Sequence, residues 1–65
     1  MNNEANDYFK SVVNGSEFEF NGAVYVKINF EVAREIRNPS KVDRKATCFS
    51  SYDAVYNPRR AYKHR

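Results

Sequence analysis

The chain has 65 residues and a formal net charge of +3 at pH 7. A chain of this length forms at most one small domain, which buries only about 60% of the surface of its unfolded state. Leucine is absent, and five phenylalanines and five tyrosines supply most of the apolar surface that folding can bury. These values exclude a multidomain enzyme, a membrane-spanning helix, a coiled coil and a leucine-packed helical bundle.

The charge is distributed unevenly along the chain. Residues 1–35 contain three lysines or arginines against six acidic residues, whereas residues 36–65 contain eight against two. The basic half of such a chain can attract an acidic partner or nucleic acid. The chain can also dock its basic half on its own acidic half.

The first predicted element is a short helix over residues 8–13. Asn6 or Asp7 can accept hydrogen bonds from the first free amides, and Gly15 fits the left-handed position that follows a helix. Apolar residues recur four apart in this segment, which places them on one helix face. Its two valines also suit a strand that turns at the following Asn-Gly, and this strand is the alternative.

Residues 17–28 predict a β-hairpin. Two runs of β-forming residues flank Asn21-Gly22, a dipeptide typical of a two-residue turn in which both residues take positive φ. Such a turn pairs Phe18 with Tyr25, so that the aromatic side chains share one face of the hairpin. The second run is apolar on both faces, which suits a tightly curled small barrel or a sheet that is covered on both sides.

Two alternatives remain open for residues 31–37. The spacing of their apolar residues fits two helical turns that end before Pro39, because a residue that precedes proline is disfavoured in the helical region. The same residues also fit the end of a long strand. Residues 38–45 are polar and show no periodicity, so we expect an exposed basic loop.

Two more short strands are predicted over residues 46–49 and 54–56, the second of which stops at Pro58. The predicted fold class is therefore α+β and mainly β, with a short N-terminal helix followed by a small curled antiparallel sheet or an SH3-like barrel. We expect one domain over residues 1–65, with fraying at residues 1–6 and 59–65.

Residues suited to catalysis are few. His64 lies next to the chain end, where a side chain is rarely held in a fixed orientation. Cys48 lies within a predicted strand and is expected to be an inert, half-buried thiol, and a single cysteine makes neither an internal disulfide nor a cysteine-based zinc site. Glu17 and Glu19 share a strand face and are expected to form its solvent-facing side. We therefore expect no enzymatic activity, no metal and no cofactor.

The segment Gly15–Ile28 resembles a pattern common in very small bacteriophage-encoded proteins. In that pattern a glycine precedes an aromatic-x-aromatic pair, Asn-Gly, and then tyrosine-x-lysine, and a short strand with phenylalanine follows, here Cys48–Ser50. The resemblance implies a compact, small β-barrel-like fold and an accessory gene product, and several such products act by occupying a host protein. It implies no particular functional residues.

We therefore predict a phage accessory factor that inhibits or redirects a host protein by occlusion, such as RNA polymerase, a nuclease or a defence enzyme. Exposed tyrosines and arginines dominate interfaces of this kind. The predicted partner-binding residues are Tyr52, Tyr56, Arg59, Arg60 and Tyr62. No basic segment followed by an apolar one opens the chain, so the expected location is the cytoplasm of the host cell.

The alternative function is a small-barrel nucleic-acid-binding module that uses the basic C-terminal half. Basic side chains neutralise phosphates, and tyrosine rings stack on unpaired bases. The residues predicted for this function are Lys41, Arg44, Lys45, Arg59, Arg60, Lys63 and Arg65. Neither function implies a small-molecule substrate or a membrane partner.

Overall fold

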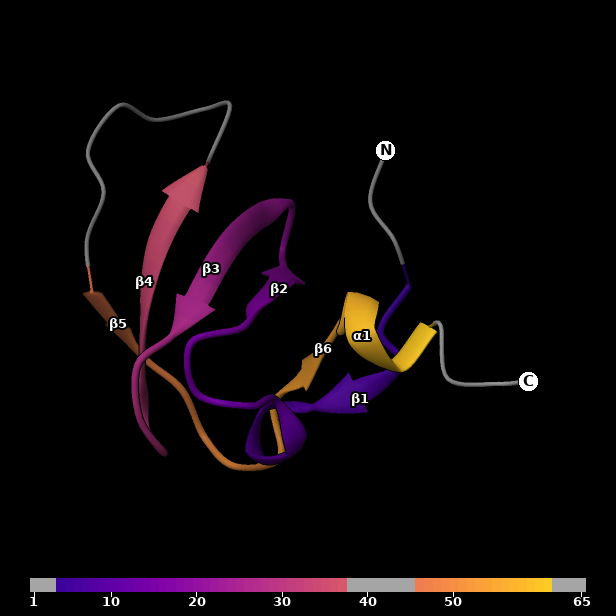
Figure 1. Cartoon of the computed structure of the whole chain (residues 1–65), viewed down its shortest axis with the longest axis horizontal. Helices are drawn as coiled ribbons and strands as arrows, with labels where there is room; N and C mark the ends of the chain where they lie inside the picture. Colours follow the sequence, from indigo (N-terminus) through magenta and orange to yellow (C-terminus); the bar gives the residue numbers. More distant parts are fainter. Residues whose placement is uncertain (1–3, 38–45, 62–65) are drawn as a thin grey trace.

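The computed structural model describes residues 4–37 and 46–61, and the statements below concern those residues. The elements in chain order are β1 (Asp7–Tyr8), η1 (a 3-10 turn, Phe9–Ser11), β2 (Glu17–Phe20), β3 (Ala23–Lys27), β4 (Val32–Arg37), β5 (Ala46–Cys48), β6 (Ala54–Val55) and α1 (Pro58–Ala61). The strands form two antiparallel sheets, one in the order β2-β3-β4-β5 and one in which β1 pairs with β6 (Figure 1).

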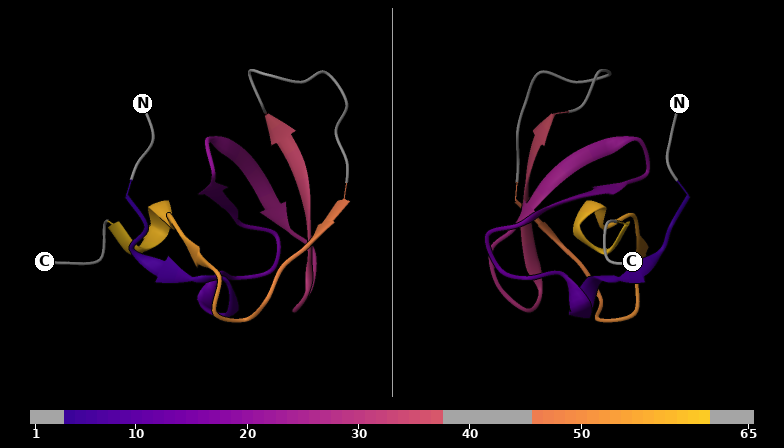
Figure 2. Two further views of the ribbon diagram at one scale, coloured as in Figure 1. Left: turned by 180° about the vertical axis from the view of Figure 1, so that it is seen from behind. Right: turned by 45° about the vertical axis from the view of Figure 1, so that its right-hand side comes forward.

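The two sheets are joined by one isolated bridge. The amide of Glu19 in β2 donates to the carbonyl of Tyr56 over 2.8 Å, and the amide of Tyr56 donates to the carbonyl of Glu19 over 2.9 Å. Both views in Figure 2 show β1, β6 and α1 on one side of the molecule and the larger sheet on the other. The core lies between these two parts.

The β-hairpin prediction is confirmed in its turn and in its register. Asn21 has φ 55° and Gly22 has φ 84°, as a two-residue turn of this kind requires. The pairing places Phe18 opposite Tyr25, as predicted from the turn. Strand alternation then buries both aromatic residues on the core side of β2 and β3.

The predicted N-terminal helix over residues 8–13 is wrong. The amides of Phe9 and Lys10, which a helix would leave for a cap, instead donate to the carbonyls of Asp53 and Ser51, both over 2.9 Å. The chain therefore enters β1, pairs with β6, and makes only the single η1 turn. Long-range backbone pairing outweighs the local capping pattern in this segment.

The strand alternative holds for the segment 31–37, most of which is β4. The predicted SH3-like barrel is wrong, because the strands form two separate sheets rather than a closed one. The α+β class with its N-terminal helix is wrong as well, because the one α-helix in the described part of the chain is α1, near the C-terminal end. The expected small antiparallel sheet fits the structure, whose described residues are mainly β. The predicted loop 38–45 lies outside the described residues.

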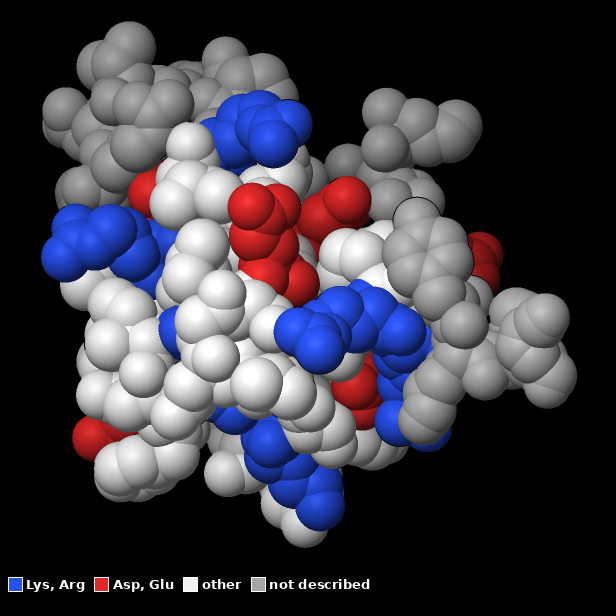
Figure 3. All heavy atoms as spheres, in the orientation of Figure 1, with Lys and Arg blue, Asp and Glu red and all other residues white. Residues whose placement is uncertain are grey.

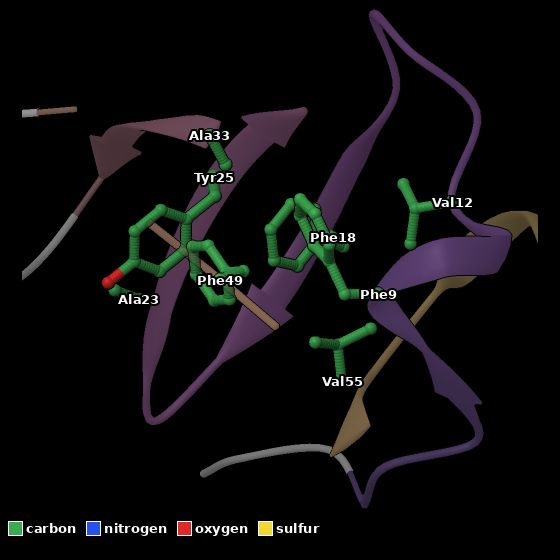
Figure 4. Close-up of a cluster of buried hydrophobic side chains, with 8 residues drawn as sticks. All are labelled: Phe9, Val12, Phe18, Ala23, Tyr25, Ala33, Phe49 and Val55. Atoms are coloured by element: carbon green, nitrogen blue, oxygen red, sulfur yellow. The ribbon is translucent and has the colours of Figure 1, made fainter. Parts of the chain in front are cut away.

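The core is built largely from aromatic rings. Phe9 from η1 stacks on Phe49 with ring centroids 4.9 Å apart, and Phe18 packs edge-on against both, at 5.6 and 5.3 Å. Figure 4 shows these side chains converging in the space between the sheets. The buried apolar residues are Phe9, Val12, Phe18, Ala23, Tyr25, Ala33, Phe49 and Val55.

We predict that Gly22→Val destabilises the protein by about 1–3 kcal/mol, because a β-branched side chain is strained at positive φ. The measurement is the midpoint of thermal unfolding followed by circular dichroism. Glu17→Val is the control, since it adds the same side chain at an exposed strand position. Equal midpoints for the two variants would contradict the turn geometry.

We predict that Phe18→Ala lowers the free energy of unfolding by about 3–5 kcal/mol, because it leaves a cavity in the ring cluster. A domain of this size has only about 5 kcal/mol of stability, so the variant should be largely unfolded at room temperature. Phe30→Ala is the matched control, because Phe30 is 74% exposed. A larger loss for Phe30→Ala in urea unfolding would show that the hairpin register is wrong.

Candidate partner-binding face

Helix α1 begins at an Asn-Pro pair. The side-chain oxygen of Asn57 accepts a hydrogen bond from the amide of Arg59 over 3.2 Å, which is the contact of an N-cap residue. Pro58 occupies the first helical position, where its missing N–H costs nothing. The sequence prediction treated Pro58 only as the end of a strand, although this pair is a recognisable helix start.

Partly buried polar contacts attach the start of α1 to β1 and to the residue before it. The side-chain amide of Asn57 donates to Oδ2 of Asp7 over 2.9 Å. The backbone N–H of Asn57 donates to the side-chain oxygen of Asn6 over 2.7 Å. The amide of Tyr8 donates to Oδ1 of Asp7 over 2.8 Å. The residues expected to cap a helix thus fix the position of α1 instead.

Two arginines of α1 border a hollow. Arg59 donates from its guanidinium to the hydroxyl of Ser16 over 3.1 Å, and the guanidinium of Arg60 lies 3.9 Å from Oδ1 of Asp7. The hollow has a volume of about 300 Å³ and is lined by Asp7, Ser11, Val13, Asn57, Arg59 and Arg60. Figure 3 shows Lys and Arg side chains gathered around the position of α1.

Tyr52 lies on a turn that two hydrogen bonds close and a third ties to η1. The amide of Asp53 donates to the carbonyl of Ser50 over 3.1 Å, and the Asp53 carboxylate accepts from the amide of Ser50 over 2.9 Å. The carbonyl of Ser51 accepts from the amide of Lys10 in η1. The turn therefore holds the backbone that carries Tyr52 in a fixed position.

The ring of Tyr52 packs edge-to-face on Tyr8 with centroids 5.6 Å apart, and Nζ of Lys10 lies 4.9 Å from the centroid of Tyr52. Tyr8 and Tyr52 are nevertheless 49% and 68% exposed. Tyr8 and Arg60 border a second hollow of about 370 Å³, which connects Tyr8 to α1. We call this surface the tyrosine–arginine face; its residues are Tyr8, Lys10, Tyr52, Arg59 and Arg60.

Three of the five residues predicted for partner binding lie on this face: Tyr52, Arg59 and Arg60. Tyr56 is half-buried, and its backbone is engaged by β2. The prediction missed Tyr8. Strand alternation in β1 turns Tyr8 outward and Asp7 inward. A helix predicted over residues 8–13 does not give this alternation. Further predicted residues lie outside the described part of the chain: Lys41, Arg44, Lys45, Tyr62, Lys63 and Arg65.

Two predictions about single side chains need correction. Cys48 is exposed rather than half-buried, and it lies on β5, an edge strand of the larger sheet. Glu17 is exposed as expected, but Glu19 is half-buried where β2 meets Tyr56. His64 lies outside the described residues.

Lys27 is a buried cation that the sequence prediction did not single out. It is 4% exposed, and its Nζ donates to the carbonyl of Phe9 over 2.8 Å and lies 4.4 Å from the centroid of the Phe9 ring. Burial lowers the pKa of Lys27 below its usual value, while the nearby Asp7 carboxylate acts in the opposite direction. Strand alternation with Tyr25 could have identified Lys27 as inward-facing.

The larger sheet also buries Glu35, which pairs with Tyr25 across β3 and β4. Burial raises the pKa of Tyr25, and the Glu35 carboxylate raises it further, whereas a hydrogen bond with Thr47 lowers it. These groups lie on the larger sheet, away from the tyrosine–arginine face.

Within residues 4–37 and 46–61, no group of three or more His, Cys, Asp or Glu side chains is placed to hold a metal ion. No helix in the same residues is long and apolar enough to cross a membrane. Comparisons of the chain with protein-family models, curated proteins and solved structures give no match. The resemblance to small phage proteins therefore stays a prediction.

The lowered pKa of Lys27 predicts a specific pH dependence of stability. Below its usual value of 10.5, the unfolded chain holds more protons at Lys27 than the folded chain does, so this group makes unfolding less favourable as the pH rises toward that value. Lys27→Met lacks this contribution. We expect the free energy of unfolding of the original protein, minus that of the variant, to increase between pH 7 and pH 10. The measurement is urea unfolding in ~0.15 M salt.

The raised pKa of Tyr25 acts in the opposite direction, because the unfolded chain loses the tyrosine proton first. Both proteins retain Tyr25, so its contribution cancels in their difference. A difference that stays constant or falls with pH would show that Lys27 is not desolvated in the folded protein.

Proposed function

We propose that this protein is a non-enzymatic interaction protein that binds one protein partner through the tyrosine–arginine face and acts by occlusion. The observation that carries the proposal is the Tyr8–Tyr52 pair, two large rings that remain 49% and 68% exposed on backbone held by hydrogen bonds. Rigid exposed tyrosines contribute large contact area at little cost in conformational entropy.

The chemical composition of the face supports the same function. Tyrosine and arginine are the residue types most enriched among those that dominate binding energy, and here they adjoin two hollows that can receive partner side chains. A protein of this size can supply a standard interface, which occupies about 800 Å² on each partner. Bound there, it would cover a functional surface of the partner without any chemical step.

The sequence pattern of the hairpin supports a bacterial partner and a phage source. We accordingly propose that the partner is a host protein in the cytoplasm, since small phage accessory proteins commonly act on host enzymes. The turn between β3 and β4 is a second exposed apolar site, with Phe30 74% and Ile28 44% exposed, so it competes for the same role.

Nucleic acid remains the second candidate, because Lys10, Arg59 and Arg60 lie on the same face as the two tyrosines. Its binding would fall steeply with salt, as each phosphate contact releases counterions. A protein interface of mixed aromatic and charged contacts would lose less affinity over the same range.

The test is a pull-down from bacterial lysate at moderate salt, with the captured protein identified by mass spectrometry and its affinity then measured with purified components. We expect Tyr52→Ser to weaken binding at least about tenfold, since it removes a central ring from the face. Phe30→Ser is the matched control and should bind like the original protein.

Two results would reject the proposal. Binding that Phe30→Ser abolishes and Tyr52→Ser leaves intact would move the interface to the β3–β4 turn. Retention of nucleic acid but of no protein, with loss at raised salt, would favour the second candidate.

A further inference from the structure

The hollow between η1 and α1 combines two cations with a small, partly polar lining. Arg59 and Arg60 border it on the α1 side, and the hydroxyl-bearing Ser11 and the apolar Val13 border it on the η1 side. Its volume of about 300 Å³ lies at the lower end of the range for small-molecule sites and is sufficient for one side chain of a partner. The site therefore suits a single acidic group carried by a larger molecule.

The carboxylate of Asp7 also borders this hollow, but its acceptors are already engaged. Oδ1 accepts from the amide of Tyr8 and Oδ2 accepts from the side chain of Asn57. Its side chain is only 5% exposed, and buried Lys27 is close enough to act on it electrostatically. Asp7 is thus stabilised without Arg60.

The two arginines differ in the contacts that hold their guanidinium groups. Arg59 is held in place by its hydrogen bond to Ser16, although the residue remains exposed. The side chain of Arg60 is 54% exposed, and its 3.9 Å separation from Asp7 is longer than a charge-assisted hydrogen bond. Both guanidinium groups can therefore donate to a carboxylate, for which their planar shape is suited.

The position of Lys10 bears on which kind of acidic molecule this face receives. Nζ of Lys10 already lies over the ring of Tyr52, so a base could stack on that side of the ring only after displacing it. This contact favours an acidic protein segment over single-stranded nucleic acid.

We infer that the hollow bordered by Arg59 and Arg60 binds a glutamate or aspartate side chain of an acidic segment in the protein partner. This inference rests on the proposed function, since it assigns the chemistry of the partner at the tyrosine–arginine face. The neighbouring tyrosines supply apolar contact beside the carboxylate.

The experiment is a titration of the ¹⁵N-labelled full chain with acetylated, amidated hexaglutamate, followed by amide chemical shifts. We expect shifts in Ser11, Val13, Arg59 and Arg60, and none with the uncharged hexaglutamine peptide. Arg59→Gln combined with Arg60→Gln should weaken binding at least about tenfold, because charge-assisted hydrogen bonds are lost.

Arg34→Gln is the matched control, since Arg34 is an exposed cation on β4 that does not border the hollow. We expect it to bind hexaglutamate as the original protein does. Equal weakening in this control and in the α1 double variant would mean that net charge alone attracts the peptide, and would overturn the inference.

The remaining outcomes are also decisive. No shifts with hexaglutamate, or shifts only outside the hollow, overturn the acidic-segment inference. Tighter binding of an oligothymidylate of six nucleotides at the same amides overturns it in favour of nucleic acid. A lysate partner that depends on Tyr52 but not on Arg59 and Arg60 leaves the proposed function standing and removes only this inference.

Discussion

The buried ammonium group of Lys27 connects the two halves of the structure. Its strand belongs to the larger sheet, whereas its Nζ donates to the carbonyl of Phe9 in η1 over 2.8 Å. The backbone of Lys27 is also tied to the loop before β2, because its amide donates to Ser16 and its carbonyl accepts from Gly15. Burying an ammonium costs several kcal/mol, which these contacts and the Phe9 ring must offset. The constraint therefore fixes η1 against β3 in one position.

Once η1 is fixed, the ring cluster and the β1–β6 pair follow. Phe9, whose carbonyl accepts from Lys27, stacks on Phe49, and the amide of Lys10 donates to the carbonyl of Ser51 in the turn that carries Tyr52. At the other end of β1, Asp7 anchors α1 through Asn57. None of the buried side-chain nitrogen and oxygen atoms in the described residues lacks a hydrogen-bond partner. A small core is thus supplemented by polar contacts between segments far apart in the sequence.

The sequence predicted those features that depend on neighbouring residues. Asn21-Gly22 determined the turn of the hairpin, and with it the burial of Phe18, because both follow from local φ preferences and strand alternation. The residues of the N-terminal segment carry a helix-capping pattern, but their amides pair with the chain around residue 52, which no local pattern reveals. Tyr8 was missed for the same reason, whereas Arg59 and Arg60 were found because charge is visible in the sequence alone.

The exposure of the two tyrosines follows from where they lie, Tyr8 on the outward side of the two-residue strand β1 and Tyr52 on the turn that precedes β6. β1 and β6 pair over two residues each, so Asp7 and Val55 turn inward while Tyr8 and Ala54 turn outward. Ala54 is too small to cover the ring opposite it, and Tyr52 covers only one edge. An aromatic ring left half in water gives up about half of the free energy that its full burial would provide, about 25 cal/mol per Å² of apolar surface. Folding alone therefore gives only part of the reason for two tyrosines at these positions, and their remaining exposed surface is the physical argument that most favours recognition of a partner there.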